Sequence, residues 1–225
     1  MNLNDKITSL AKTFGAADIG FSDVEGLNDY GYKYAVSIFV RLLDGVVDEI
    51  TDKPTYEYYS HYKSVNTLIN DLTLRVATLI EDSGYKALTV SSSQSVGERE
   101  EYRGMFPHKT AATRSGRGYI GKSGLFVHDD FGPRLRIGTV LTNAPLIVGI
   151  PKTESECGEC NLCVRNCPAS AQTGKNWYAG MERNDLYDPR ACSEFMKNYF
   201  SHIGNGFVCG ICMQVCPKGK KNKRL

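Results

Sequence analysis

Cysteine spacing is the feature of this sequence with the clearest chemistry. All eight cysteines lie between Cys157 and Cys216, and the first 156 residues contain none. Thiols stay reduced in the cytoplasm, so cysteines grouped in this way are more typical of metal ligands or redox groups than of a disulfide framework. Their spacing therefore predicts a metal site.

The first four cysteines follow the pattern Cys-x-x-Cys-x-x-Cys-x-x-x-Cys-Pro, from Cys157 to Cys167 and Pro168. Each iron of a cubane 4Fe-4S cluster takes one soft thiolate, and three thiolates at this spacing can surround one cluster while the fourth points toward another. A zinc site is the alternative, but zinc modules use two separated Cys-x-x-Cys pairs or mixtures of Cys and His. The pattern favours iron-sulfur clusters.

The last three cysteines repeat this motif without its first member. They form Cys209-x-x-Cys212-x-x-x-Cys216-Pro, and Gly206 stands where the missing cysteine would be. Cys192, on a predicted helix upstream, can supply the absent thiolate. The alternative is that Cys192 is a buried, inert thiol.

Eight thiolates suffice for two complete clusters. In two-cluster ferredoxins the fourth cysteine of each motif binds the cluster of the other motif. On that pattern, one cluster is held by Cys157, Cys160, Cys163 and Cys216. The other is held by Cys167, Cys192, Cys209 and Cys212. We therefore predict two 4Fe-4S clusters and a role in electron transfer.

The composition is that of an ordinary soluble protein. Hydrophobic residues make up 41%, charged residues 23%, and the net charge is +2, so charge alone identifies no nucleic acid or other partner. The N-terminal segment lacks a basic stretch followed by an apolar one, and no apolar run approaches the roughly 20 residues that span a bilayer. We expect a cytoplasmic protein without a membrane partner.

The change in cysteine content predicts a domain boundary near Pro151. We expect an N-terminal domain over residues 1–150, a cluster-binding domain over 151–217 and a basic tail over 218–225. Apolar periodicity predicts helices near residues 3–14 and 56–83. Runs of β-branched and aromatic residues predict strands over 17–21, 34–42, 86–91, 124–127 and 134–141. Together these predict an α+β fold: an α/β sandwich, then a two-cluster ferredoxin-like domain.

The C-terminal arrangement resembles the ferredoxin-like domain of epoxyqueuosine reductases and of the related corrinoid-dependent reductive dehalogenases. The matching segments are CGECNLCVRNCPASA, ACSEF and VCGICMQVCP. The likeness continues upstream in HKTAATRSGRGYIGKS (108–123), FGP (131–133) and GTVLT (138–142). It covers most of residues 86–217, and more weakly the N-terminal helix and strand.

The resemblance implies a cobalamin site, because these families place a corrinoid against the nearer cluster, which reduces it. It implies corrinoid contacts from Arg114, Gly118, Tyr119, Ile120, Gly121 and Lys122. The same loop spells Gly-x-Gly-x-x-Gly from Gly116, but a dinucleotide-binding turn follows a buried strand, whereas residues 108–115 are polar and helix-like. A tight turn without any ligand is the alternative.

Two departures from the family concern the substrate. Epoxyqueuosine reductases carry an aspartate proton donor in a strand-end motif, whereas residues 88–94 here (LTVSSSQ) contain no acid. The charged stretch that follows could bring another group to the site or form a solvated loop; its candidates are Glu98, Glu100, Glu101, Tyr102 and Arg103. The relatives' C-terminal domain that helps to hold tRNA has no counterpart after Pro217, so a tRNA partner is not favoured. The basic tail could contact phosphates or be a solvated end.

Two functions remain open. The first is a cobalamin-linked iron-sulfur reductase, in which a low-potential donor such as ferredoxin or flavodoxin supplies electrons that the clusters pass to a corrinoid acting on a small or nucleoside-like substrate. The second is a non-catalytic ferredoxin-type carrier, or a reductive activator of another corrinoid protein. About 150 residues without cysteine exceed what a bare ferredoxin needs, which favours the enzyme. No catalytic residue can be assigned from the sequence.

Overall fold

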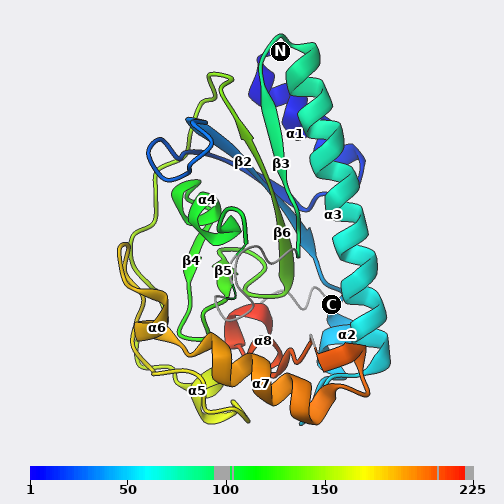
Figure 1. Cartoon of the computed structure of the whole chain (residues 1–225), viewed down its shortest axis with the longest axis vertical. Helices are drawn as coiled ribbons and strands as arrows, with labels where there is room; N and C mark the ends of the chain where they lie inside the picture. Colours follow the sequence, from blue (N-terminus) through cyan, green and yellow to red (C-terminus); the bar gives the residue numbers. More distant parts are fainter. Residues whose placement is uncertain (94–101, 103, 207, 221–225) are drawn as a thin grey trace. The chain divides into compact units, whose positions relative to one another are not determined.

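A computed structural model of the chain describes residues 1–93, 102, 104–206 and 208–220. The chain forms two compact units, each assembled from separate stretches (Figure 1). Unit 1 comprises Met1–Arg41, Val65–Gly118 and Leu135–Lys152. Unit 2 comprises Leu42–Ser64, Tyr119–Arg134 and Thr153–Leu225. These units are defined by packing, so the predicted domain boundaries at residues 150 and 217 stay a prediction.

Unit 1 contains a four-stranded antiparallel sheet in the order β1-β2-β6-β3. The strands are β1 (Asp18–Asp23), β2 (Tyr34–Arg41), β3 (Ala87–Val90) and β6 (Leu135–Thr142). The helices of this part of the chain are α1 (Leu3–Thr13), α3 (Tyr56–Asp82), which begins in unit 2, and α4 (His108–Arg114). Mixed helices and strands confirm the predicted α+β class.

Helices lie on both faces of this sheet (Figure 1). Gly138 faces α3, because a Cβ atom there would lie 2.6 Å from Cγ2 of Ile69. Gly20 faces the opposite side, because a Cβ atom there would lie 2.3 Å from Oγ of Ser115, directly after α4. Successive strand residues point to opposite faces, so the sheet is enclosed between helices, as the sandwich prediction requires.

The two long N-terminal helices form where their sequences contain start and stop signals. Asn2 caps α1 by accepting a hydrogen bond from the Asp5 amide at 2.8 Å, and Asp5 closes a capping box. On α3, fully buried apolar residues recur at helical spacing, which fixes the face that packs on the sheet: Ile69, Leu72, Val76 and Ile80. Gly84, at φ +88°, follows the end of α3. Both helices confirm the predictions.

Unit 2 consists of short elements. They are α2 (Asp44–Asp48), α5 (Leu162–Arg165), α6 (Arg183–Leu186), α7 (Pro189–Phe200), α8 (Ile211–Gln214), the 3-10 turns η1 (Gly204–Gly206) and η2 (Pro217–Lys220), and a hairpin of β4 (Gly118–Ile120) and β5 (Phe126–His128). The strand predicted over residues 124–127 starts later, because Gly124, at φ +72°, belongs to the hairpin turn. The sequence did not predict β4 or α2.

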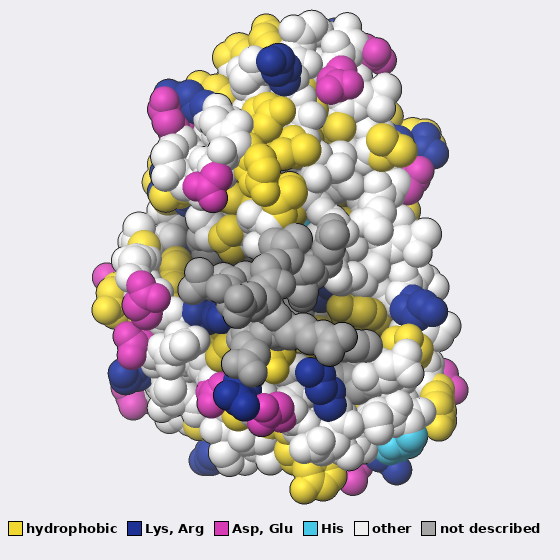
Figure 2. Space-filling view, in the orientation of Figure 1, with side chains coloured by type: hydrophobic (Ala, Val, Ile, Leu, Met, Phe, Trp, Pro, Cys, Tyr) yellow, Lys and Arg dark blue, Asp and Glu magenta, His cyan; other side chains and the backbone are white. Residues whose placement is uncertain are grey.

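The surface carries charges of both signs. On the face shown in Figure 2, basic and acidic side chains are interspersed, in keeping with the net charge of +2. Within the described residues, no helix combines the length and the apolar character that crossing a membrane requires.

Candidate metal centre

All eight cysteines are free thiols in unit 2. Cys160 is exposed and the other seven are partly buried. Cys163 lies on α5, Cys192 on α7 and Cys212 on α8. Asp188 caps α7 through hydrogen bonds from the amides of Arg190 and Ala191 and precedes Pro189 at the first turn, which fixes the start of the helix that carries Cys192.

Four of these thiols form a first group. Burial, together with the charges of Cys157, Cys216 and Cys160, raises the pKa of Cys163 to about 11. Burial also raises the pKa of Cys216, and Cys157 and Cys160 add to this effect. Cys216 thus lies near the three cysteines at the start of the first motif, and the crossed assignment of ligands stays a prediction.

The other four form a second group. Burial raises the pKa of Cys192 to about 11, with Cys209 and Cys167 adding to the increase. Burial raises the pKa of Cys212 well above its usual value, and Cys209 and Cys192 are the largest charges acting on it. Cys163 of the first group also acts on Cys212, so the two groups are neighbours. Cys192 is therefore close to the other thiols of the second motif.

Backbone amides point at several of these sulfurs. The amides of Lys218 and Gly219 donate to Cys216 and lower its pKa, opposing the effect of burial. The amide of Ala171 lies 3.5 Å from Sγ of Cys167. Such N–H to sulfur bonds favour the thiolate over the thiol, which is the form that binds iron.

The donor set fits cubane clusters. Four thiolates crowded into one partly buried site repel one another, so the deprotonated set is stable only around a cationic centre. In the described part of the chain, which includes all eight cysteines, no three Cys, His, Asp or Glu side chains are grouped to hold a single metal ion. A cubane has a different requirement, because each of its thiolates binds a different iron.

The β4–β5 hairpin lies next to the first group of thiols. Burial raises the pKa of Tyr119, and the charges of Cys157, Glu156 and Cys216 raise it further. A Cβ atom on Gly121 would lie 3.5 Å from Sγ of Cys157. Tyr119 also packs in a buried cluster with Val127, Trp177 and Leu186, against which Cys157 is placed.

Comparison with known proteins agrees with this geometry. Residues 156–219 match the family described as a 4Fe-4S double cluster binding domain. An epoxyqueuosine reductase of Staphylococcus aureus is 29% identical over 126 residues, which are 52% of this chain and 30% of that protein. A tetrachloroethene reductive dehalogenase of Sulfurospirillum multivorans is 29% identical over 119 residues, 49% of this chain and 23% of the dehalogenase.

This chain is thus similar to epoxyqueuosine reductases and to reductive dehalogenases. Its fold agrees: a catabolic reductive dehalogenase superposes with a TM-score of 0.73 at 18% identity, over 95% of this chain and 31% of that one. Epoxyqueuosine reductase from Streptococcus thermophilus gives 0.60 at 20% identity, over 98% of this chain and 67% of that one. The matched part is less than a third of the two curated relatives' own length.

The six residues that the resemblance assigns to a corrinoid lie in different surroundings. Tyr119, Gly121 and Lys122 are buried in unit 2 beside the first group of thiols, and Ile120 is partly exposed. Arg114 and Gly118 belong to unit 1. Their role in corrinoid binding stays a prediction.

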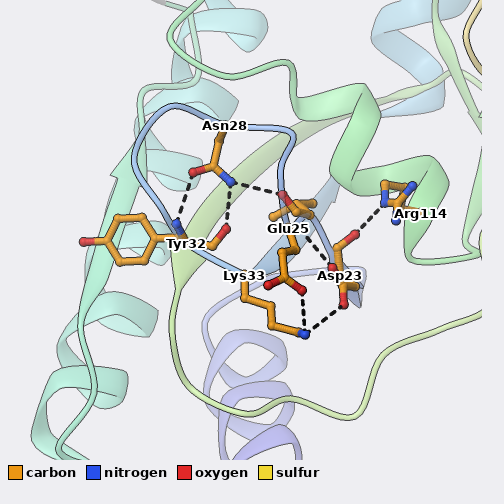
Figure 3. Close-up of polar contacts among 7 residues, drawn as sticks. Asp23, Glu25, Asn28, Tyr32, Lys33 and Arg114 are labelled. Atoms are coloured by element: carbon orange, nitrogen blue, oxygen red, sulfur yellow. Dashed lines mark hydrogen bonds and ion pairs between the residues drawn. The ribbon is translucent and has the colours of Figure 1, made fainter.

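Arg114 secures the end of β1. Its Nε donates a hydrogen bond to the backbone carbonyl of Asp23, beside a loop in which Lys33 pairs with Glu25 at 2.7 Å (Figure 3). Asn28 Nδ2 closes the same loop by donating to the Tyr32 carbonyl at 2.7 Å.

The glycine-rich loop approaches its own chain. Gly116, at φ +75°, lies so near the segment after β6 that a Cβ atom would be 2.5 Å from the Ile150 carbonyl oxygen. The loop leaves helix α4 and enters strand β4, whereas a dinucleotide-binding loop runs from a strand into a helix. These contacts support the tight-turn alternative for Gly116 and the rejection of a dinucleotide site.

The end of β3 is organised by His108, whose role the sequence did not reveal. His108 Nδ1 lies 2.8 Å from Thr139 Oγ1, and Nε2 lies 3.1 Å from the Ser91 carbonyl. Arg136 donates to the Ser92 carbonyl at 3.2 Å. Four of the candidates for a substitute group lie outside the described residues: Glu98, Glu100, Glu101 and Arg103.

Arg134 is a second residue whose role the sequence did not predict. It is only 2% exposed and donates to Asp44 at 2.9 Å and Asp48 at 2.7 Å. Its side chain packs on Gly219, so it supports the turn that follows Cys216. A charged residue at the start of a predicted buried strand was the available signal.

Proposed function

We propose that this chain is an iron-sulfur reductase that transfers electrons through two 4Fe-4S clusters. Cys157, Cys160, Cys163 and Cys216 hold the first cluster, and Cys167, Cys192, Cys209 and Cys212 hold the second. The observation that carries the proposal is the grouping of eight thiols, seven of them partly buried, into two neighbouring sets of four. The match to a double cluster binding domain supports it.

Neighbouring clusters suit stepwise electron transfer. Each cubane takes up one electron, and the electrostatic contact between Cys163 and Cys212 indicates that the two sites are close to each other. The reductant is a low-potential protein donor of the ferredoxin or flavodoxin class. Iron and acid-labile sulfide analysis of anaerobically purified protein tests this part. We expect about eight iron and eight sulfide ions per chain. A colourless protein loaded with zinc would overturn the proposal of two clusters.

The acceptor that we propose is a corrinoid, which when bound supplies a cobalt centre able to act on a substrate. One solved reductive dehalogenase has a structure that suggests a mechanism for B12-dependent dehalogenation. In this chain Ile120 is partly exposed and could contact such a ligand, whereas Tyr119 and Lys122 are buried. The last two side chains therefore do not fit direct contact with a corrinoid.

A second function, that of an electron carrier for another corrinoid protein, is favoured by this burial. The visible spectrum of the anaerobic protein before and after addition of cobalamin separates the two functions. A shift in the cobalamin bands with saturable binding supports the reductase. Unperturbed cobalamin in the presence of fully assembled clusters would support the carrier.

The substrate class follows from the relatives only as a proposal. A solved epoxyqueuosine reductase holds an epoxyqueuosine-modified tRNA stem loop. Here the described strand-end residues Ser91, Ser92 and Ser93 provide no carboxylic acid. We therefore propose a small or nucleoside-like substrate whose reduction does not use an acid at that position.

A further inference from the structure

Lys122 is a buried cation in the unit that contains the cysteines. Only 4% of its surface is exposed, and its Nζ donates to Oδ1 of Asn161 at 3.0 Å. Taking an ammonium group out of water is costly unless negative charge compensates it. Asn161 is a neutral amide, so this hydrogen bond does not offset the positive charge.

The position of Lys122 associates it with the first set of thiols. Gly121, the preceding residue, packs against Sγ of Cys157, and Asn161 directly follows Cys160. Asn161 is also the N-cap residue of α5, the helix that carries Cys163. Lys122 is thus tied to the Cys-x-x-Cys-x-x-Cys segment through its hydrogen bond with Asn161 and through the packing of Gly121.

We propose that Lys122 compensates the negative charge of the first cluster and thereby raises the reduction potential of that cluster. This inference rests on the proposed function, in which Cys157, Cys160, Cys163 and Cys216 hold the first cluster. A cubane with four thiolates is anionic, and its charge becomes more negative by one on reduction. A nearby buried cation therefore stabilises the reduced state more than the oxidised state.

Three other charged groups of unit 2 do not supply a comparable positive charge. Glu156 and Asp129 lie near Tyr119, but both are exposed, so solvent and salt screen their charges. Arg134 is buried, but the carboxylates of Asp44 and Asp48 offset its charge. Arg134 therefore serves mainly to support the turn after Cys216.

The test is a spin-resonance-monitored redox titration of the full chain carrying Lys122→Met. The substitution removes the charge and keeps an unbranched side chain that is one atom shorter. We expect the ratio of reduced to oxidised cluster at a fixed potential to fall at least tenfold for one cluster. For a one-electron couple, this corresponds to a midpoint potential that is lower by about 59 mV. The same comparison in a Cys192→Ala background, which retains the first cluster's ligands, identifies the affected cluster.

A matched control removes an exposed lysine from the same unit. Lys175 is 60% exposed and lies 3.9 Å from Asp185, so Lys175→Met makes the same charge change in solvent and should leave both midpoints unchanged. An unchanged midpoint in a fully loaded Lys122→Met protein would overturn the proposal. A shift equal to that of Lys175→Met, or one confined to the second cluster, would overturn it as well.

Two further variants cover loss of the cluster. If Lys122→Met assembles less iron, two other variants are compared. Lys122→Gln can still form a hydrogen bond with Asn161 but has no charge, and Lys122→Arg keeps the charge. Full iron in Lys122→Arg alone supports charge compensation. Equal loss in Lys122→Arg and Lys122→Gln would show that Lys122 acts through packing. Wild-type iron analysis separates failure of this inference from failure of the proposed cluster content.

Discussion

His108 and Thr139 join α4 to the central strand of the unit 1 sheet, with 2.8 Å between Nδ1 and Oγ1. The other ring nitrogen, Nε2, lies 3.1 Å from the Ser91 carbonyl and so donates to it. Nδ1 is then the acceptor for the threonine hydroxyl. The arrangement requires a neutral imidazole.

The stability of the chain should consequently depend on pH through His108. Burial lowers its pKa from 6.5 to about 4, and the charge of Arg136 contributes in the same direction. Between these values the unfolded chain binds the proton more readily, so stability is full above pH 6.5 and falls as the pH drops toward 4. Between pH 6.5 and pH 4 the free energy of unfolding falls by about 1–3 kcal/mol, a figure that allows for the partial exposure of the side chain.

Thermal unfolding of the anaerobic protein at about pH 7.5 and about pH 6 measures this effect. About 1 kcal/mol should be lost over this interval, which lowers the midpoint by roughly 2–4 °C in wild type. His108→Gln should be less stable at both values, but its midpoint should depend less on pH. Equal pH dependence of the two proteins would show that His108 is not the group responsible.

Cys192→Ala should remove one cluster and leave the other. Cys192 interacts with Cys209, Cys167 and Cys212 and lies on α7, so its loss opens one iron of the second cluster. Iron per chain should fall by about half, with one spin-resonance signal retained. Unchanged iron and unchanged signals would restore the interpretation of Cys192 as an inert thiol.

Gly132→Ala should destabilise the turn after Cys216. Gly132 has φ +60°, and a Cβ atom there would lie 2.5 Å from the backbone nitrogen of Gly219 and carbonyl carbon of Lys218, whose amides donate to Cys216. Left-handed backbone costs about 1–2 kcal/mol and the overlap about 1–3 kcal/mol more. We expect a lower thermal midpoint and reduced iron content.

Gly180 provides the matched control for that substitution. Its φ of +91° is at least as unfavourable for alanine, but nothing lies within 4 Å of a Cβ atom there. Gly180→Ala should therefore carry the backbone cost alone and retain all of its iron. If the two variants lose stability and iron equally, the close approach of Gly132 to the turn has no special importance.

The sequence was most informative where function depends on local spacing. The cysteine motifs predicted a domain that binds two clusters, in agreement with the family match, and apolar periodicity predicted α1 and α3. The assignment of each cysteine to one cluster stays a prediction. Contacts between segments far apart in the chain leave no comparable pattern in the sequence. The pairing of Arg134 with Asp44, and of His108 with Ser91, depends on how strands and helices meet in three dimensions, and sequence patterns do not encode strand order. Burial of Lys122 was equally hidden, because lysine in a glycine-rich loop is normally exposed.

The final prediction concerns the tRNA reaction that the relatives' names suggest. A positioned general acid contributes about 10²- to 10⁴-fold to a rate. The strand end offers Ser91, Ser92 and Ser93 instead of an acid, and His108 cannot replace it as a cation, because its pKa of about 4 keeps it neutral and its nitrogens contact Ser91 and Thr139. We expect the reduced protein with added cobalamin to convert epoxyqueuosine in tRNA more slowly, by a similar factor, than an epoxyqueuosine reductase assayed in parallel. A rate equal to that of the reference enzyme would show that another group of this chain supplies the proton.

Ser92→Asp serves as the matched gain-of-function variant. A rate that rises with an acid at this position would confirm that the missing proton donor limits the reaction.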